Sequence, residues 1–268
     1  ELTARIDALF RRTGNDDVQA VVQERVPITL TDEHQTSEYG MIRFRVKATV
    51  TDVGGESHVA EWTVNASNRE FGLDLAVQSV VDMAKDAAFK VEAYDINHEK
   101  VEGKGKYEIM CNSHVLAEGE FTSGDSIPLP KSLKLGVEYR IAVTAYEKNG
   151  TKVVDYGSFV PFDSSLPVAD VDKWGISEKR RTERNDYEKE DDFIHSTAST
   201  FKVGGAIDLF FTTQETDAYI LYNVYNVNGL LEHHVGVTDG TMQHLRLPYR
   251  KEWGEGIEVD IIYVRNGR

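Results

Sequence analysis

Residues 139–160 read YRIAVTAYEKNGTKVVDYGSFV, and this stretch decides the fold. Apolar and polar residues alternate over Tyr139–Tyr146, which is typical of a half-buried antiparallel strand. Asn149-Gly150 follows, and an Asn-Gly pair favours a two-residue hairpin turn because both positions require positive φ. Val153–Val160 then returns as the second strand. The stretch therefore predicts a β-hairpin.

The same design occurs at two other places in the chain. Met41–Asp52 alternates, Gly54-Gly55 can turn the chain, and Val59–Val64 alternates on the way back. Ile257–Val264 also alternates and is followed by Asn266-Gly267. The three copies stand roughly 95 and 118 residues apart, which suits sandwich modules of about 100 residues and is too long for a solenoid. We therefore predict an all-β chain of tandem immunoglobulin/fibronectin-like β-sandwich domains.

Three further strand patterns support this fold class. Ala87–Tyr94 and Ala206–Phe211 are apolar runs that follow short polar or glycine-containing stretches. Tyr219–Tyr225 alternates and ends at Asn228-Gly229, which predicts another hairpin.

The first residues follow a different period. Leu2, Ile6, Leu9 and Phe10 stand at helical spacing, and residues 13–15 (Thr-Gly-Asn) stop the pattern. These positions predict a short N-terminal helix. The alternative is a strand with a frayed start.

Changes in composition divide the chain into four units. Residues 1–70 supply few strands and are expected to form a partial N-terminal β-sandwich with the short helix. Residues 71–168 and 193–268 are each expected to form a β-sandwich, the second of them truncated. Residues 169–192 are expected to be a charged linker or loop, because residues 173–192 carry dense charge and few apolar side chains.

Both ends of the sequence suggest excision from a longer chain. The sequence begins with Glu1 rather than Met, and it stops at residues 266–268 one strand short of closing a hairpin. We expect any signal peptide or lipid anchor to lie upstream.

Composition excludes several classes of function. The chain has 268 residues and a net charge of −15, which disfavours nucleic-acid partners and docking on anionic membranes. Its single cysteine, Cys111, excludes an internal disulfide framework. No apolar run approaches the ~18 residues of a membrane span, so we expect no direct membrane insertion.

No catalytic, cofactor-binding or metal-binding motif is recognisable, so we predict that the chain is not an enzyme and has no cofactor. His233 and His234 are adjacent in a strand-like stretch, so they point to opposite faces and are unsuited to one metal ion. Cys111 alternates with Ile109, which favours a core thiol over a reactive one. The chain contains no GxSxG nucleophile motif and no phosphate-binding loop.

The aromatic residues leave a binding function open. Trp62, Trp174 and Trp253, with the tyrosines, could form a platform that stacks on sugars, or they could pack across strands. The platform interpretation corresponds to ligand- or glycan-binding modules of a surface adhesin.

Several stretches resemble bacterial alpha-2-macroglobulin-like proteins. Residues 39–75 (YGMIRFRVKATVTDVGGESHVAEWTVNASNREFGLDL) resemble the end of one macroglobulin-type domain and the start of the next. Residues 217–232 (DAYILYNVYNVNGLLE) and 245–267 (LRLPYRKEWGEGIEVDIIYVRNG) resemble the strand pattern and the GEG and Asn-Gly motifs of the family.

The resemblance implies a function as well as a fold. It implies seven-stranded fibronectin-like sandwiches within a large exported protein of the bacterial periplasm or outer cell surface. It also implies a role in protease trapping, with proteases and the other domains of the parent chain as partners. The family's thioester uses Cys-x-x-Gln, and Cys111 is followed by Asn112, Ser113 and His114, so no functional residue is transferred.

One segment suits the role of a protease-exposed loop. Residues 173–192 are rich in Lys and Arg, the residues after which trypsin-like enzymes cut; the candidate positions are Lys179, Arg180, Arg181 and Arg184. The alternative is a solvated connection between domains.

Overall fold

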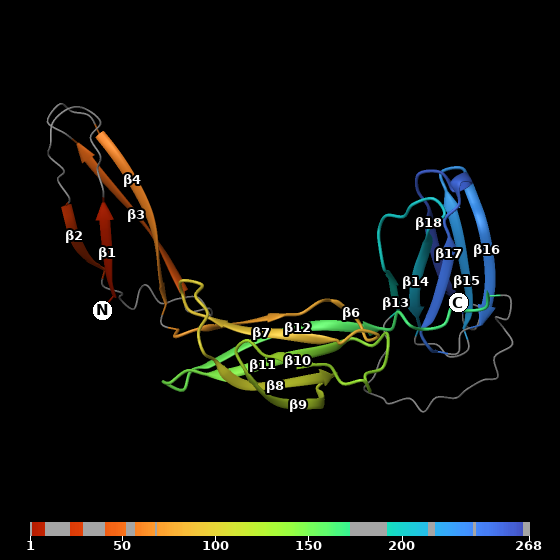
Figure 1. The fold of residues 1–268 in the computed structure, drawn as a ribbon, viewed down its shortest axis with the longest axis horizontal. Coiled ribbons are helices and arrows are strands. Elements are labelled where there is room, and N and C mark those ends of the chain that lie inside the picture. The colour runs from red at the N-terminus through yellow and green to blue at the C-terminus, as the bar shows by residue number, and fades with distance from the viewer. Residues whose placement is uncertain are drawn as a thin grey trace.

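The computed structural model describes residues 2–8, 22–28, 41–51, 57–67, 69–171, 192–213, 218–237 and 240–264. Over these residues the chain is almost entirely β-structure (Figure 1), so the predicted all-β fold class is confirmed. Three parts follow one another along the long axis of the molecule: the strands β1–β4, a middle sandwich and a last sandwich.

The predicted N-terminal helix is wrong. Residues Leu2–Ala8 form strand β1, which pairs antiparallel with β2 (Val22–Ile28) from Leu2↔Ile28 to Ala8↔Val22. The apolar residues of this stretch also fit a period of two, and a helix of two turns has little stability by itself. Cross-strand pairing therefore decides the structure, and Leu9 and Phe10 of the helical pattern lie outside the described residues.

The first predicted hairpin is confirmed. Strand β3 (Met41–Thr51) pairs antiparallel with β4 (Ser57–Ser67) over their whole length. Phe44 and Val46 are half-buried, whereas Arg45 between them is exposed, as the alternation predicts. The predicted turn at Gly54-Gly55 lies outside the described residues.

The middle sandwich consists of two sheets that enclose one core. The smaller sheet has the order β10-β7-β5, and the larger has the order β6-β12-β11-β8-β9. Their bounds are β5 Gly72–Ala76, β6 Val80–Asp82, β7 Ala88–Tyr94, β8 Lys104–Cys111, β9 His114–Thr122, β10 Ser126–Pro128, β11 Tyr139–Tyr146 and β12 Lys152–Phe162. Phe89 of one sheet meets Phe159 of the other edge to face, with ring centroids 5.0 Å apart.

The hairpin that predicted the fold lies at the centre of this sandwich. β11 and β12 pair from Tyr139↔Phe159 to Tyr146↔Lys152. Gly150 in the turn has φ of +84°, and the backbone N–H of Thr151 donates to Asn149 Oδ1 at 2.8 Å. The Asn-Gly pair therefore lies in the turn at the predicted place, but Gly150 and not Asn149 has positive φ. Five residues lie between the paired Tyr146 and Lys152, so the turn is longer than the predicted two-residue turn.

The last sandwich repeats this two-sheet plan with three strands in each sheet. One has the order β13-β14-β17 and the other β16-β15-β18. Their bounds are β13 Phe193–Ser196, β14 Ala206–Thr212, β15 Tyr219–Asn226, β16 Gly229–Val237, β17 Gln243–Pro248 and β18 Glu258–Val264. A core that includes Leu209, Tyr222 and Leu245 lies between the two sheets.

Each strand of the last sandwich corresponds to a strand of the middle one, whereas β6 and β12 have no counterpart in the described part of the last sandwich. Strands β14, β15, β16, β17 and β18 follow one another and pair in the same way as β7, β8, β9, β10 and β11. In addition, β13 pairs with β14 as β5 pairs with β7. One difference concerns the final strand. β11 lies between β12 and β8, whereas β18 is an edge strand within the described part of the chain.

Residues 245–256 close the core of the last sandwich. Within them Lys251–Trp253 make a short 3₁₀ turn that directs Trp253 inward, where only 2% of its surface is exposed. The Tyr249 hydroxyl donates to the Gly254 carbonyl, and Asn226 Nδ2 donates to the Trp253 carbonyl at 3.0 Å. The motif that carries the family resemblance is therefore a core-closing loop, and Trp253 is no surface platform.

Candidate functional site

The candidate site is the joint between the two sandwiches, which begins with an unusual strand. β14 carries Leu209, Phe210 and Phe211 in succession, and all three are buried. Neighbouring strand residues point to opposite faces, so Leu209 and Phe211 enter the sandwich core while Phe210 lies on the outer face of the sheet. In register beside Phe210 lie His195 on β13 and His244 on β17.

Phe162, the last residue of β12 in the middle sandwich, covers this outer face. Its ring centroid lies 5.1 Å from that of Phe210 and 4.7 Å from that of His195. Phe162 is 6% exposed and shares one apolar cluster with Phe193 and Met242. The two sandwiches are therefore joined by a common set of buried rings, to which Val80, Leu135, Val160 and Leu166 add partly buried contacts.

A glycine brings the two backbones close beside these rings. Gly136, in the loop before β11, has φ of +76° and donates its N–H to the Pro161 carbonyl at 2.9 Å. A Cβ placed on Gly136 would lie 2.1 Å from Cγ2 of Thr212 on β14. The joint therefore requires glycine here for two reasons, the left-handed backbone and the close approach of the last sandwich.

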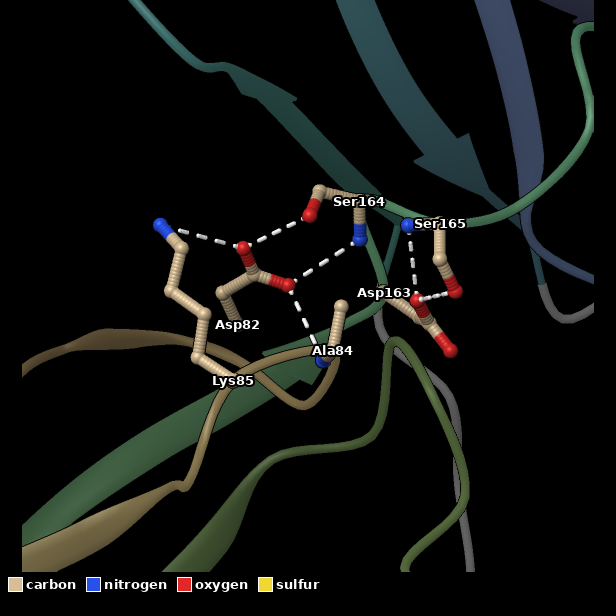
Figure 2. Close-up of polar contacts among 6 residues, drawn as sticks. All are labelled: Asp82, Ala84, Lys85, Asp163, Ser164 and Ser165. Atoms are coloured by element: carbon tan, nitrogen blue, oxygen red, sulfur yellow. Dashed lines mark hydrogen bonds and ion pairs between the residues drawn. The ribbon is translucent and has the colours of Figure 1, made fainter.

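The segment that connects the two sandwiches begins at Asp163, after β12, and we call it the connecting segment. The carboxylate of Asp82 fixes its start (Figure 2). Asp82 Oδ1 accepts from the backbone N–H of Ser164 at 3.0 Å, and Oδ2 accepts from the Ser164 hydroxyl at 2.7 Å. The N–H of Ala84 adds a third hydrogen bond, and Lys85 Nζ lies 3.3 Å from Oδ2. Burial by itself raises the pKa of Asp82, but these hydrogen bonds outweigh it and lower the pKa below 3.8.

Ser165, the next residue of the segment, is held by the side chain of Asp163. Asp163 Oδ1 accepts from both the N–H and the hydroxyl of Ser165, which forms a tight turn (Figure 2). The chain thus leaves β12 in a defined direction.

His244 holds the next described residues of the connecting segment, Leu166 and Ala169. Its Nδ1 lies 2.8 Å from the Leu166 carbonyl oxygen, and its own carbonyl accepts from the N–H of Ala169 at 2.7 Å. Ala169 and Val171 pack partly buried against the core of the last sandwich. Residues 163–171 of the connecting segment are therefore held at Ser164, Leu166 and Ala169, and their last part packs on the last sandwich.

The same sheet face is built differently in the middle sandwich. There β7 carries Glu92 between the core residues Val91 and Ala93, as β14 carries Phe210 between two core residues. Glu92 pairs with Lys90 at 2.6 Å and with Lys100 at 2.7 Å. The outer face of the sheet therefore carries an ion-pair network in the middle sandwich and a buried aromatic joint in the last sandwich.

The residues that the sequence singled out either lie outside the described residues or are described away from this joint. Lys179, Arg180, Arg181 and Arg184 lie outside the described residues, as does Trp174. His233 and His234 point to opposite faces as predicted, since His233 Nδ1 lies 2.7 Å from Asn223 Oδ1 while His234 stacks on Tyr222. Cys111 is 1% exposed in the middle core, again as predicted.

The sequence contains a signal for the joint that the alternation analysis does not use. A sandwich strand with one solvated face should alternate, and consecutive apolar residues at 209–211 break that rule. Such a run indicates a strand that is covered on both faces. Asp82 and Gly136 leave no comparable signal, because their roles depend on segments that are remote in sequence.

Among the residues that the structure describes, no helix is long and apolar enough to cross a bilayer. In the same residues, no three or more His, Cys, Asp or Glu side chains are grouped so that they could hold a metal ion.

Sequence comparison gives no relatives: no family model matches the chain, and no curated protein matches it. Solved structures give distant similarities. Native E. coli alpha-2-macroglobulin is similar over 94% of this chain and 17% of its own, with 16% identity and a TM-score of 0.33.

Two adhesin structures are also similar. A tetra-tandem repeat from the extending region of a large adhesion protein matches 85% of this chain and 57% of its own, with 12% identity and a TM-score of 0.27. A Ca²⁺-stabilised, ice-binding adhesin of an Antarctic bacterium matches 77% and 48%, with 11% identity and a TM-score of 0.23. The chain thus spans less than two thirds of each of these proteins.

Proposed function

We propose that this chain is a non-catalytic structural segment whose two sandwiches act as one stiff unit within a larger exported protein. The observation that carries the proposal is the joint, in which Phe162 packs between rings of the last sandwich. Domains joined by a linker move relative to each other by default, unless the interface between them is apolar and packed. Here the interface is apolar and buried, and hydrogen bonds hold the connecting segment.

Stiffness follows from the combination of contacts. The aromatic cluster resists separation of the sandwiches, since exposing it would return buried apolar surface to water. Asp82 and His244 hold the start of the connecting segment at Ser164 and at Leu166, so the chain that leaves β12 cannot swing freely. A stiff unit keeps the sequences on either side of it at a fixed distance and angle.

The proposal is tested by a distance measurement across the joint. Nitroxide labels on cysteines introduced at Val115 and Val227, both exposed, report the separation of the sandwiches by double electron–electron resonance. Cys111 is buried, and labelling of the parent chain serves as the control for its reactivity. A single narrow distance distribution supports the proposal, and a broad one overturns it.

A more specific proposal concerns the parent protein. We propose that the units 1–70, 71–168, 169–192 and 193–268 belong to an alpha-2-macroglobulin-like protein of the bacterial periplasm or cell surface that traps proteases. One support is the core-closing loop at residues 245–256, whose sequence motif resembles that of the family. The other is the Lys- and Arg-rich composition of residues 173–192. In this proposal Lys179, Arg180, Arg181 and Arg184 are exposed to proteases.

Limited proteolysis tests this second proposal. Trypsin at low ratio is expected to cut first after the four basic residues, with the fragments identified by mass spectrometry. A variant with all four replaced by Gln is the control and should lose that first cut. Cleavage elsewhere first, or full resistance of residues 173–192, contradicts the protease-exposed segment but leaves the stiff joint untouched.

A further inference from the structure

The outer face of the larger sheet in the middle sandwich carries a groove whose lining shares no residue with the joint. The groove has a volume of about 600 Å³ and is lined mainly by residues of β8, β9 and β11. Thr144 on the central strand β11 has a short, half-buried side chain, and Lys106 on β8 lies beside it in register. Glu120 on β9 lies in turn beside Lys106. A short side chain among longer ones leaves the sheet hollow at this position.

Tyr146, the last residue of β11, also lines the groove. It lies on the same face as Thr144, because Ala145 between them points into the core. Its side chain is 64% exposed. A tyrosine ring presents an apolar face and a polar edge. The groove therefore combines an open aromatic face with a polar lining.

The polar lining carries positive and negative groups in equal number. Three lysines and three carboxylates line the groove, namely Lys104, Lys106, Lys152, Glu108, Glu120 and Asp125. Lys106, Glu108 and Glu120 form no side-chain hydrogen bond or ion pair with any other residue that the structure describes. An ammonium group can only donate a hydrogen bond, and an ionised carboxylate can only accept one. These groups are therefore available to a ligand that both donates and accepts.

These features together select the chemistry of the ligand. A sugar hydroxyl both donates and accepts, so neighbouring hydroxyls can bind lysine and glutamate side chains at once. The C–H face of a sugar ring is apolar and can stack on Tyr146. The formal charges of the lining cancel, and the net charge of −15 on the whole chain disfavours an anionic ligand.

We propose that this groove binds a neutral oligosaccharide. Tyr146 stacks on one sugar ring, and Lys106, Glu108 and Glu120 bind the hydroxyls of that ring and its neighbours. The volume lies within the range of about 300–1,000 Å³ that is typical of small-molecule sites. This binding function goes beyond the proposed stiff unit and does not depend on it.

The corresponding sheet of the last sandwich presents a different outer face. There Leu221 on β15 lies in register between Val235 on β16 and Ile262 on β18. Val235 and Ile262 are both exposed. A row of three apolar side chains offers no hydrogen bond to a hydroxyl, so the proposed chemistry belongs to the middle sandwich and is no general property of the fold. The last sandwich therefore supplies a control within the same chain.

Amide chemical shifts of the whole nitrogen-15-labelled chain test the proposal. The probes are the neutral hexasaccharides cellohexaose, maltohexaose and N-acetylchitohexaose, with the anionic hexagalacturonate as a comparison. We expect at least one neutral probe to shift the amides of residues 104–108 and 144–146 in a saturable manner. The same probe should bind more tightly than hexagalacturonate.

Two substitutions locate the binding in this groove. Tyr146→Ala removes the stacking face and should weaken the binding of that probe about tenfold. Lys106→Met keeps the apolar stem but removes the donor, and it should weaken binding about fivefold. Tyr219→Ala is the matched control, because Tyr219 is 58% exposed and lies on the last sandwich. The control should bind as wild type does, and circular dichroism checks that each variant is folded.

The outcomes decide the proposal and the source of the ligand. The proposal is overturned when no neutral probe shifts these amides, when Tyr146→Ala binds as tightly as wild type, or when hexagalacturonate binds more tightly than the neutral probes. If a neutral probe binds, retention of the chain on an insoluble polysaccharide of the same sugar assigns the groove to polysaccharide chains. Binding without retention assigns it to free oligosaccharides. None of these results bears on the stiff unit, which the Val115–Val227 label pair tests separately.

Discussion

Phe162 and Phe210 belong to different sandwiches, yet their rings lie 5.1 Å apart between centroids with an interplanar angle of 53°. Both side chains are almost fully buried, at 6% and 1% exposure. This contact makes the outer face of one sheet in the last sandwich an internal surface of the molecule. It follows that the stability of the last sandwich should depend on a residue of the middle one.

Replacing Phe162 with Ala should uncouple the two sandwiches. Truncation of a buried Phe costs about 3 kcal/mol or more, and we expect roughly 3 kcal/mol to be lost from the unfolding free energy of the last sandwich in urea. Tyr146→Ala, at an exposed aromatic residue of the same sheet, is the control and should change stability by at most about 0.5 kcal/mol. Equal effects of the two substitutions would contradict a packed joint.

Gly136→Ala should cost more than Gly150→Ala, although both glycines have similar positive φ values of +76° and +84°. A Cβ on Gly150 would contact nothing within 4 Å, so it carries only the backbone cost of about 1 kcal/mol. At Gly136 the Cβ would also collide with Thr212. Thermal denaturation should show a clearly larger loss for Gly136→Ala. A second substitution, Thr212→Ser, removes the colliding methyl group and should recover part of the difference.

Asp82→Asn should remove part of the acid sensitivity of the protein. The folded pKa of Asp82 lies below 3.8, so its carboxylate stabilises the fold fully above that pH. The stabilisation is lost as the pH falls from 3.8 through the lower folded value. Urea unfolding across that range should show a shallower pH dependence in Asp82→Asn than in wild type. A double-mutant cycle with Ser164→Ala should give a coupling of roughly 1 kcal/mol, and zero coupling would contradict the Asp82–Ser164 contact.

Amide hydrogen exchange should differ between the equivalent strands β11 and β18. β11 is paired on both sides, whereas β18 is an edge strand within the described residues. Backbone N–H groups that are not paired within a sheet exchange more readily. We therefore expect alternate amides of Glu258–Val264 to exchange faster than those of Tyr139–Tyr146. Equal protection along both strands would show that the outer edge of β18 is covered.

The sequence predicts the individual strands better than it predicts the joint. Alternation and Asn-Gly turns are local signals, so the hairpin at 139–160 and strand β18 are found where they are expected. The N-terminal strand is missed because Leu2 and Ile6 fit both periods, and only the remote partner β2 distinguishes them. Apart from the apolar run at residues 209–211, the sequence carries no signal for the joint, because Asp82, Gly136 and Phe162 meet partners that are remote in the sequence.

Residual dipolar couplings decide whether the two sandwiches move as one body. Backbone N–H couplings measured in a weakly aligned sample of the whole chain give one alignment tensor for β7–β12 and one for β13–β18. We expect the two tensors to agree in magnitude and orientation in wild type and to diverge in Phe162→Ala. Tensors that already differ in wild type by as much as in the variant would contradict this expectation.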